Sequence, residues 1–380
     1  MLRIVADENI LFAEKAFSTL GEVTLLPGRK IAHHHLKHAD ILLVRSVTQV
    51  THALLRNTPV QFVGTATIGT DHVDTADLAE AGIAFASAAG CNADAVAEYV
   101  LTAMAHIAVQ KGIALPGSKI GIVGVGNIGG RVRRLARALD MEVLLNDPPL
   151  KRLTGNSEYL ALDALLDTDF LSLHVPLNMA GEDKTWHLFD SRQLEKLHKD
   201  IVLINTSRGP LIDNSALTTW AKNHSDASIV LDVWENEPEI SADLLAHVDL
   251  GTPHIAGYSL EGKINGTYLI YKALCRYLNR SPVWQPELPA PENEIVKVRG
   301  DTGIEHALFE TTSKAYAITK DDANLRKLPG LPKPEQPVYF DSLRKKYVLR
   351  REFCNYTIRL APMDSNIAHA LSVFRFSIPG

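Results

Sequence analysis

Short apolar runs alternate with amphipathic stretches along the first part of the chain. The runs typical of strands are "LRIVA", "EVTLL", "ADILLVRS", "QFVGTA" and "IAFASA", and the stretches typical of helices include "LFAEKAFSTL" and "TADLAEAG". Strands that alternate strictly with helices form βαβ units. The pattern therefore predicts a parallel sheet with helices packed on its faces.

A second series of strands and helices follows. Its strand candidates are "KIGIVGVG", "MEVLLNDP", "DFLSLHVPL", "DIVLINTS", "SIVLDVW" and "VDLGTPHI". Several of them are apolar throughout, which is typical of parallel strands covered on both faces. Two long helical patterns, "ADAVAEYVLTAMAHIAVQ" and "SLEGKINGTYLIYKALCRYLN", stand before and after this series. We therefore expect a second sheet domain inserted into the first, to which the chain then returns.

The remaining residues predict a third, smaller part. The proline-rich "RSPVWQPELPAPENE" is typical of a linker, and "EIVKVRG", "NYTIRLA" and "VFRFSI" after it are typical of strands, with "IEHALFETTSKAYAI" and "DSLRKKYVLRREF" as helices. The fold class is thus α/β, with two doubly wound parallel sheets. We expect a flavodoxin-like domain at 1–95 and 258–285, a Rossmann-type domain at 96–257, and a small α/β domain at 286–380.

Composition and charge exclude several classes of function. The formal net charge of −5 gives no support for a nucleic-acid-binding protein. The three cysteines are scattered, which indicates a reducing compartment, and no apolar run approaches membrane-spanning length. The start "MLRIVADENI" lacks the order of a signal peptide. We expect a cytoplasmic protein without nucleic-acid or membrane partners, and no metal site at the "HHH" of residues 33–35.

The stretch "IGIVGVGNIGGRVRRLA" contains a G-x-G-x-x-G pattern between a strand and an amphipathic helix. Gly124 permits the tight turn, Gly126 allows the backbone to approach a pyrophosphate, and Gly129 permits close packing of helix on strand. The helix N-terminus adds free N–H groups and a partial positive charge. Asp147, at the end of the next strand, is placed to accept hydrogen bonds from ribose hydroxyls, which favours NAD over NADP.

Three later strands end in residues suited to hydride-transfer chemistry. Arg208 follows "DIVLINTS" and offers a planar fork for a carboxylate. His254 follows "VDLGTP" and can act as both base and acid. Glu237, after "SIVLDVW", is placed to fix the tautomer of that histidine and to raise its basicity. Ligands bind at strand carboxyl ends in such sheets, so we expect the three side chains to act together.

"GIVGVGNIG", "INTSRGPLID", "LDVWENEP" and "TPHIAG" occur in this order, and together they resemble the D-isomer-specific 2-hydroxyacid dehydrogenases. The resemblance covers residues 1 to about 285 and implies Arg208 as the substrate-binding arginine, Glu237 as the partner of the histidine, and His254 as proton donor and acceptor. It also implies cofactor contacts from a larger set, comprising Asn127, Ile128, Asp147, Val175, Thr206, Ser207, Arg208, Asp232 and Gly257.

The first domain supplies candidates for substrate binding. Arg45 and Ser46 end a predicted strand, and an arginine beside hydroxyls suits a phosphate, although pairing of Arg45 with an acidic neighbour is an equal alternative. Thr67 and the backbone at Gly69 are suited to a carboxylate. Further resemblance, in "GTATIGTDHVD", "AGYSLEGK" and the C-terminal part, implies a phosphorylated substrate that touches Ser46, Thr67 and Tyr258, and a homodimer.

Two alternatives stay open at this point. One is a dehydrogenase of another phosphorylated hydroxy acid, 3-phosphoglycerate. The other is an NAD-sensing, co-repressor-like binding protein, because such proteins can keep the same three side chains. The basic run "RKKYVLRRE", residues 344–352, is interpreted as a solvated helix face, with contact to the phosphate end of a partner subunit's site as the alternative.

Overall fold

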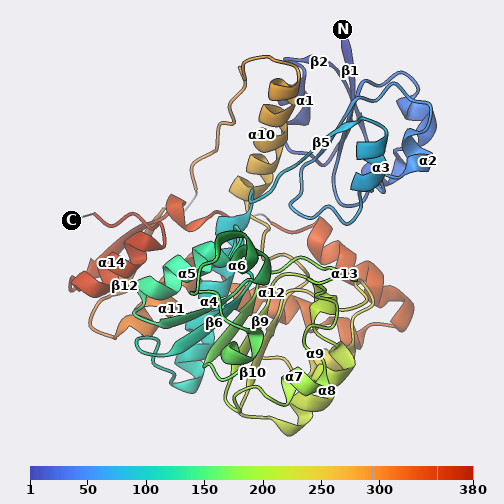
Figure 1. Cartoon of the computed structure of the whole chain (residues 1–380). Coiled ribbons are helices and arrows are strands. Elements are labelled where there is room, and N and C mark those ends of the chain that lie inside the picture. The colour runs from blue at the N-terminus through green and yellow to red at the C-terminus, as the bar shows by residue number, and fades with distance from the viewer. Residues whose placement is uncertain (292–293, 349, 380) are drawn as a thin grey trace. The chain divides into compact units, whose positions relative to one another are not determined.

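The computed structural model of the chain describes residues 1–291, 294–348 and 350–379 (Figure 1). The contacts between residues divide the chain into two units: Met1–Asn92 with Ser259–Pro289, and Ala93–Tyr258 with Ala290–Gly380. The chain thus leaves the first unit after Asn92 and re-enters it at Ser259. The three-domain division expected from the sequence stays a prediction. No helix in the described ranges is long and apolar enough to cross a membrane.

The first unit is built on a parallel sheet in the order β2-β1-β3-β4-β5, the flavodoxin-like order. The strands are β1 (Leu2–Asp7), β2 (Gly21–Leu26), β3 (Ile41–Val44), β4 (Phe62–Thr65) and β5 (Ala84–Ser87). The helices are α1 (Ala13–Phe17), α2 (His52–Leu55), α3 (Thr75–Glu80) and α10 (Leu260–Tyr277). The predicted alternation of strand and helix is confirmed, including the return of the chain through α10.

Alternate residues of these strands enter two different cores, as the period of two requires. Ile4 packs in the cluster that includes α1 and α10, whereas Val5 packs in the cluster on the other face. α10 approaches the sheet closely, since a side chain at Gly266 would lie 2.9 Å from the carbonyl oxygen of Ala66. The returning helix is therefore part of this unit's core.

The second unit contains a parallel sheet in the order β11-β10-β9-β8-β6-β7. Its strands are β6 (Lys119–Val123), β7 (Glu142–Asn146), β8 (Phe170–Leu173), β9 (Val202–Asn205), β10 (Ser228–Leu231) and β11 (Leu250–Gly251). Its helices are α4 (Ala93–Lys111), α5 (Gly129–Ala138), α6 (Pro148–Thr154), α7 (Ser191–Leu194), α8 (Asn214–Asn223) and α9 (Ala242–Leu245). A parallel bridge from Leu145 to Tyr159 stands where the third Rossmann strand would pair with β7. The strand order changes direction between β6 and β8, and this switch point is where dinucleotides bind in such sheets.

The C-terminal residues pack against this second sheet. They form β12 (Ile295–Arg299), α11 (Ile304–Ala315), α12 (Ile318–Leu325), α13 (Gln336–Lys345), β13 (Thr357–Ala361) and α14 (Ser365–Val373). β12 and β13 pair in parallel, and α11 lies against α4 within one hydrophobic cluster (Figure 1). Short 3₁₀ helices complete the chain: η1 (Gly28–Lys30), η2 (His33–Leu36), η3 (Leu162–Leu165), η4 (Gly209–Leu211), η5 (Leu328–Gly330), η6 (Lys333–Glu335) and η7 (Phe353–Asn355).

Two predictions for this C-terminal part are wrong. The expected strand "VFRFSI" is the end of α14 followed by a segment in which Ser377 makes one bridge to Thr357. The expected helix "DSLRKKYVLRREF" stops at Lys345, and residues 346–348 and 350–352 of the basic run are not helical. In both cases the structure of the segment depends on how it is buried against neighbouring elements, and its own composition does not show this.

Candidate active site

The glycine loop between β6 and α5 has the geometry that a dinucleotide needs. Gly124 has φ of 89°, in the left-handed region, and a side chain there would lie 2.7 Å from the carbonyl oxygen of His174. Nothing lies within 4 Å of the side-chain position at Gly126, so the backbone is open to a ligand on that side. A side chain at Gly129 would overlap the carbonyl oxygen of Gly124, which requires glycine at the helix start.

Asp147 lies beside this loop at the end of β7. Its Oδ2 accepts a hydrogen bond from the Val125 N–H (2.8 Å), and its Oδ1 accepts one from the Leu150 N–H (3.0 Å) as the N-cap of α6. The carboxylate is therefore held at the loop by backbone donors rather than by a cation. Arg152 is turned to an ion pair with Glu182 and Asp183 instead. A negative charge in this place suits ribose hydroxyls and repels a 2′-phosphate.

Two polar atoms near the switch point are buried without a hydrogen-bond partner among the described residues. They are Oγ1 of Thr206, after β9, and Nδ1 of His174, after β8. By contrast, the hydroxyl of the neighbouring Ser207 already donates to the carbonyl oxygen of Leu173 at 2.6 Å. Buried polar atoms are expected to be satisfied, so these two fit a site that a ligand completes. The residues present are thus suited to NAD.

Sequence reasoning did not find His174. Its Nε2 lies 2.9 Å from the hydroxyl of Ser172, and burial lowers the pKa of the imidazole from its ordinary value to about 3. A histidine held neutral in this way is a hydrogen-bonding group and not a charge. The signal was present, because "LSLHVPL" places His174 one residue before the predicted Val175, at a strand end.

The three residues expected to act on the substrate follow three neighbouring strands. Arg208 follows β9, Glu237 follows β10 and His254 follows β11, and these strands are adjacent in the sheet. Nδ1 of His254 lies 2.8 Å from Oε2 of Glu237. This distance is that of a charge-assisted hydrogen bond, which directs Nε2 of the ring away from the carboxylate.

Glu237 is held as a carboxylate by its surroundings. Burial by itself raises the pKa of Glu237, but the charge of His254, its hydrogen bond and a second one from the Trp234 N–H (2.8 Å) outweigh burial, so the pKa is lowered. Arg344, near the end of α13, acts in the same direction. The carboxyl is therefore ionised and able to stabilise a protonated imidazole.

Asp232 holds the loop that carries His254 through hydrogen bonds to the main chain of that loop. The His254 N–H donates to the main-chain oxygen of Asp232 (2.7 Å), and the Asp232 carboxylate accepts from the N–H groups of Ile255 (2.7 Å) and Ala256 (2.9 Å). The hydroxyl of Thr252 donates to the same carboxylate at 2.6 Å. Asp232 is thus a structural support of the loop, and the cofactor contact expected from it stays a prediction.

Arg208 projects from the turn between β9 and η4. Its Nη1 donates to the main-chain oxygen of Ser207 (2.8 Å), and its own carbonyl oxygen accepts from the side chain of Asn205 (2.9 Å). The backbone of this turn lies directly against that of Trp234. A side chain at Gly209 would overlap the Trp234 carbonyl, so the position requires glycine. The substrate-binding role of Arg208 stays a prediction, as do the cofactor contacts of Asn127, Ile128, Val175 and Gly257.

The substrate candidates of the first unit lie at the carboxyl ends of two neighbouring strands. Arg45 and Ser46 follow β3, and Thr67 and Gly69 follow β4. Nη1 of Arg45 donates to the carbonyl oxygen of Asn9 (3.1 Å), whereas Ser46 is exposed. The hydroxyl of Thr67 bonds Thr65 (2.7 Å) and the Gly69 carbonyl oxygen (3.0 Å). The fifth candidate, Tyr258, belongs to the second unit, where it hydrogen-bonds Arg344.

The interpretation of the basic run, residues 344–352, as a solvated helix face is wrong for three of its residues. Arg350 is 8% exposed and Glu352 is 2% exposed, both inside the second unit. Arg344 is half-buried beside Tyr258. Nothing in the run itself signals this burial, because a sequence rich in lysine and arginine is ordinarily solvated. Among the described residues, no group of three or more His, Cys, Asp or Glu side chains is arranged to hold a metal ion.

Comparison with known proteins defines the class. A family model described as the NAD binding domain of D-isomer specific 2-hydroxyacid dehydrogenases matches residues 95–256, and one described only as a domain of unknown function matches residues 287–372. A solved glyoxylate reductase from Paecilomyes thermophila is 26% identical, with a TM-score of 0.59, over 72% of this chain and 94% of its own. An NAD+-bound 3-phosphoglycerate dehydrogenase of Entamoeba histolytica, 22% identical, shares the fold with a TM-score of 0.62 over 73% of this chain and 95% of its own.

Curated relatives extend the match to nearly the whole chain. Proteins of Salmonella paratyphi A and Salmonella newport, each named erythronate-4-phosphate dehydrogenase, are 44% identical over 355 residues, which is 93% of this chain and 92% of theirs. The chain therefore belongs to the D-isomer specific 2-hydroxyacid dehydrogenase family, as its motifs predicted. It is an NAD-dependent oxidoreductase.

Proposed function

We propose that this chain oxidises 4-phospho-D-erythronate to 2-oxo-3-hydroxy-4-phosphobutanoate in the biosynthesis of pyridoxal phosphate. The observation that carries the proposal is the pairing of His254 with Glu237 beside an NAD-type glycine loop, in a chain 44% identical over 355 residues to proteins with this name. The extent of the match matters because it includes the C-terminal region. The solved glyoxylate reductase and 3-phosphoglycerate dehydrogenase, by contrast, cover only 72% and 73% of this chain.

The residues of the chain supply the acid–base part of the reaction. Arg208 and the turn at residues 67–69 bind the substrate carboxylate, and Arg45 with Ser46 binds the phosphate. His254 accepts the proton of the C2 hydroxyl through Nε2, because its Nδ1 is bonded to Glu237. Glu237 stabilises the imidazolium that results. The glycine loop and Asp147 would hold NAD, which would supply the acceptor for the hydride from C2.

The cofactor preference follows from Asp147. Its carboxylate lies against the glycine loop at 2.8 Å from the Val125 nitrogen, so a 2′-phosphate on the adenosine ribose would meet a negative charge. NAD is therefore preferred over NADP. Replacement of Asp147 by asparagine should raise kcat/KM for NADP relative to kcat/KM for NAD. Steady-state kinetics with each cofactor measure this ratio.

One assay separates this function from its alternatives. NADH fluorescence should rise when NAD and enzyme are mixed with 4-phospho-D-erythronate, and not with 3-phosphoglycerate. Turnover of 3-phosphoglycerate would favour a dehydrogenase of that substrate. The absence of turnover with any phosphorylated hydroxy acid, together with tight NADH binding, would favour a co-repressor-like binding protein.

The remaining parts of the proposal concern assembly and location. We expect a homodimer in which the C-terminal region takes part, and a cytoplasmic enzyme. Light scattering on the purified full chain measures the first, against the 41.7 kDa of one chain. A mass near that of one chain at micromolar concentration would contradict the dimer.

A further inference from the structure

Arg350, from the C-terminal region, binds the main chain of the loop that carries His254. Its Nη2 donates to the carbonyl oxygens of Ala256 (2.5 Å) and Ala95 (2.8 Å). Its Nη1 donates to those of Ile255 (3.2 Å) and Tyr258 (3.4 Å). Only a guanidinium presents enough donors in one plane to reach four carbonyl oxygens. The side chain thus ties the loop after β11 to the first turn of α4.

Ile255 and Ala256 are held from both sides. The N–H groups of Ile255 and Ala256 donate to the carboxylate of Asp232, and their carbonyl oxygens accept from Arg350. A buried carboxylate and a buried guanidinium therefore fix both polar ends of the residues that directly follow His254. His254 itself has φ of 57°, in the left-handed region that a histidine rarely adopts. Such a conformation persists only where the surrounding contacts hold it.

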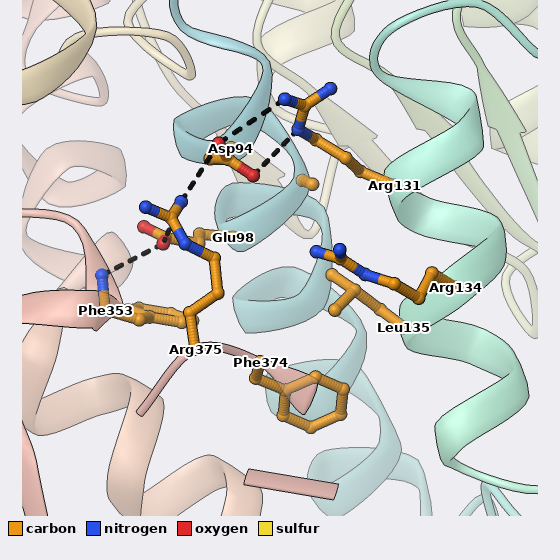
Figure 2. Close-up of a pocket in the computed structure, with 9 residues that line it drawn as sticks. Asp94, Glu98, Arg131, Arg134, Leu135, Phe353, Phe374 and Arg375 are labelled. Atoms are coloured by element: carbon orange, nitrogen blue, oxygen red, sulfur yellow. Dashed lines mark hydrogen bonds and ion pairs between the residues drawn. The ribbon is translucent and has the colours of Figure 1, made fainter. Parts of the chain in front are cut away.

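Arg350 is in turn held by contacts of its own region. Its guanidinium lies 4.2 Å from the ring centre of Tyr316, which suits a cation–π contact. Figure 2 shows the neighbouring anchor, where the Phe353 N–H donates to Glu98 of α4 (2.9 Å) and Arg375 lies between Asp94 and Glu98. Arg375 pairs with Asp94 at 3.1 Å. The segment that bears Arg350 is therefore fixed to α4 independently of the histidine loop.

We infer that Arg350 is a positioning residue for His254, and that the C-terminal domain of unknown function completes the active site through it. This rests on the proposed function only for the choice of substrate. Arg350 donates to main-chain carbonyl oxygens and not to the ring of His254. It acts by holding residues 255–258, and so fixes the direction in which His254 presents Nε2. Among the described residues, Asp232 and Glu237 interact with the charge of His254 and Arg344 interacts with that of Glu237, and none of these three is removed by a change at Arg350.

The chain offers a matched control in Arg326, the residue that directly follows α12. It also binds main-chain carbonyl oxygens of the second unit, those of Leu245 (3.1 Å), Val248 (2.7 Å) and Asp249 (3.2 Å). These residues precede β11, whereas Arg350 binds the residues that follow it. Both arginines therefore fasten the C-terminal region to the same strand, and only Arg350 does so at the end that carries His254.

The experiment compares Arg350→Ala, Arg350→Lys and Arg326→Ala in the full chain. We expect Arg350→Ala to lower kcat roughly a hundredfold, because small displacements of reacting groups have effects of this order. Its pH–rate profile should move. Arg350→Lys keeps the charge and part of the hydrogen bonding, so it should recover part of kcat. Arg326→Ala should lower the melting temperature while kcat and the pH–rate profile stay as in wild type.

A second readout needs no substrate. NMR titration of the His254 ring in histidine-labelled enzyme, assigned with His254→Gln, should change in Arg350→Ala and Arg350→Lys but not in Arg326→Ala. A wild-type enzyme inactive on 4-phospho-D-erythronate would contradict the proposed function and leave this titration as the test. The inference is overturned if folded Arg350→Ala, or Arg350→Lys where the alanine variant does not fold, keeps the wild-type kcat and titration. It is equally overturned if Arg326→Ala loses kcat to the same extent.

Discussion

The carboxyl ends of the two sheets differ in how firmly their polar side chains are held. In the second unit, His254 is bonded to Glu237, and the loop that follows it is held between Asp232 and Arg350. In the first unit, Arg45 makes one hydrogen bond to the Asn9 carbonyl oxygen, and Ser46 is exposed. Arg45 and Ser46 at the first sheet end are therefore held less firmly than His254 at the second.

The two sheet ends are therefore expected to contribute to different kinetic parameters. Groups that are rigid before the substrate arrives need no reorganisation during proton transfer, so they contribute mainly to kcat. Groups that are ordered by the substrate use part of the binding energy for that ordering, so they contribute mainly to KM. Changes in the second unit should accordingly lower kcat, and changes in the first should raise KM.

The largest effect is expected from His254→Ala. Loss of the general base should lower kcat by roughly a hundredfold to ten-thousandfold, since that is the usual contribution of such a group. NADH binding should survive, because the glycine loop and Asp147 lie at other strands of the sheet. Steady-state turnover and NADH fluorescence titration measure the two quantities. An unchanged kcat would remove His254 from the mechanism.

The rigid sheet end was also the part that the sequence predicted best. Arg208, Glu237 and His254 follow apolar runs that could only be parallel strands, and strand ends of one sheet come together wherever the strands are neighbours. The glycine loop could also be predicted from the sequence. The backbone geometry that requires glycine at positions 124 and 129 belongs to a short segment of the chain. Here local pattern and tertiary structure agree.

The supports of that sheet end could not be predicted. Arg350 lies almost a hundred residues after the loop that it binds, inside a run whose lysines and arginines are typical of a solvated surface. Its burial depends on the carbonyl oxygens of other segments, which carry no sequence signal at all. The strand expected at "VFRFSI" failed for a related reason, because its first residue, Val373, is the last residue of α14.

Glu237→Gln should give the next largest effect and tests whether the carboxylate is part of the rigid set. A hydrogen bond to a charged group contributes about 1.5–3 kcal/mol, which corresponds to roughly a tenfold to hundredfold loss of kcat. The pH–rate profile should move toward lower pH, because the protonated ring loses its anionic partner. Kinetics between pH 5 and pH 9 measure both.

The control for Glu237 is a second histidine–glutamate pair at the end of the same strand. Nε2 of His187 lies 2.8 Å from Oε1 of Glu235, the same distance as in the pair of His254. Glu235→Gln removes an equal charge from the same loop without touching His254. Its kcat and pH–rate profile should match the wild type. Equal losses in the two variants would mean that general charge, and not the pair, is responsible.

A smaller effect, of the opposite kind, is expected in the first unit. Arg45→Gln should raise the KM for 4-phospho-D-erythronate about tenfold, because a partly exposed cation contributes at the lower end of the range for charged hydrogen bonds. kcat should change little. Arg56→Gln, an exposed arginine after α2, serves as the control for net charge. A loss confined to kcat would contradict the proposed division between the two sheets.

The smallest effect concerns stability and the neutral His174 at the rigid sheet end. Its pKa is about 3 in the folded chain, below the ordinary value of 6.5, so between these values the unfolded chain takes up a proton that the folded chain does not. The free energy of unfolding therefore falls as pH falls through this window. His174→Gln removes that contribution, and the wild type should lose up to about 1.4 kcal/mol per pH unit relative to it between pH 6 and pH 4. Urea unfolding at each pH measures this difference, with a substitution of the exposed His38, His38→Gln, as control. If the free energy of unfolding of wild type and of His174→Gln changed in parallel with pH, His174 would be protonated in the folded chain.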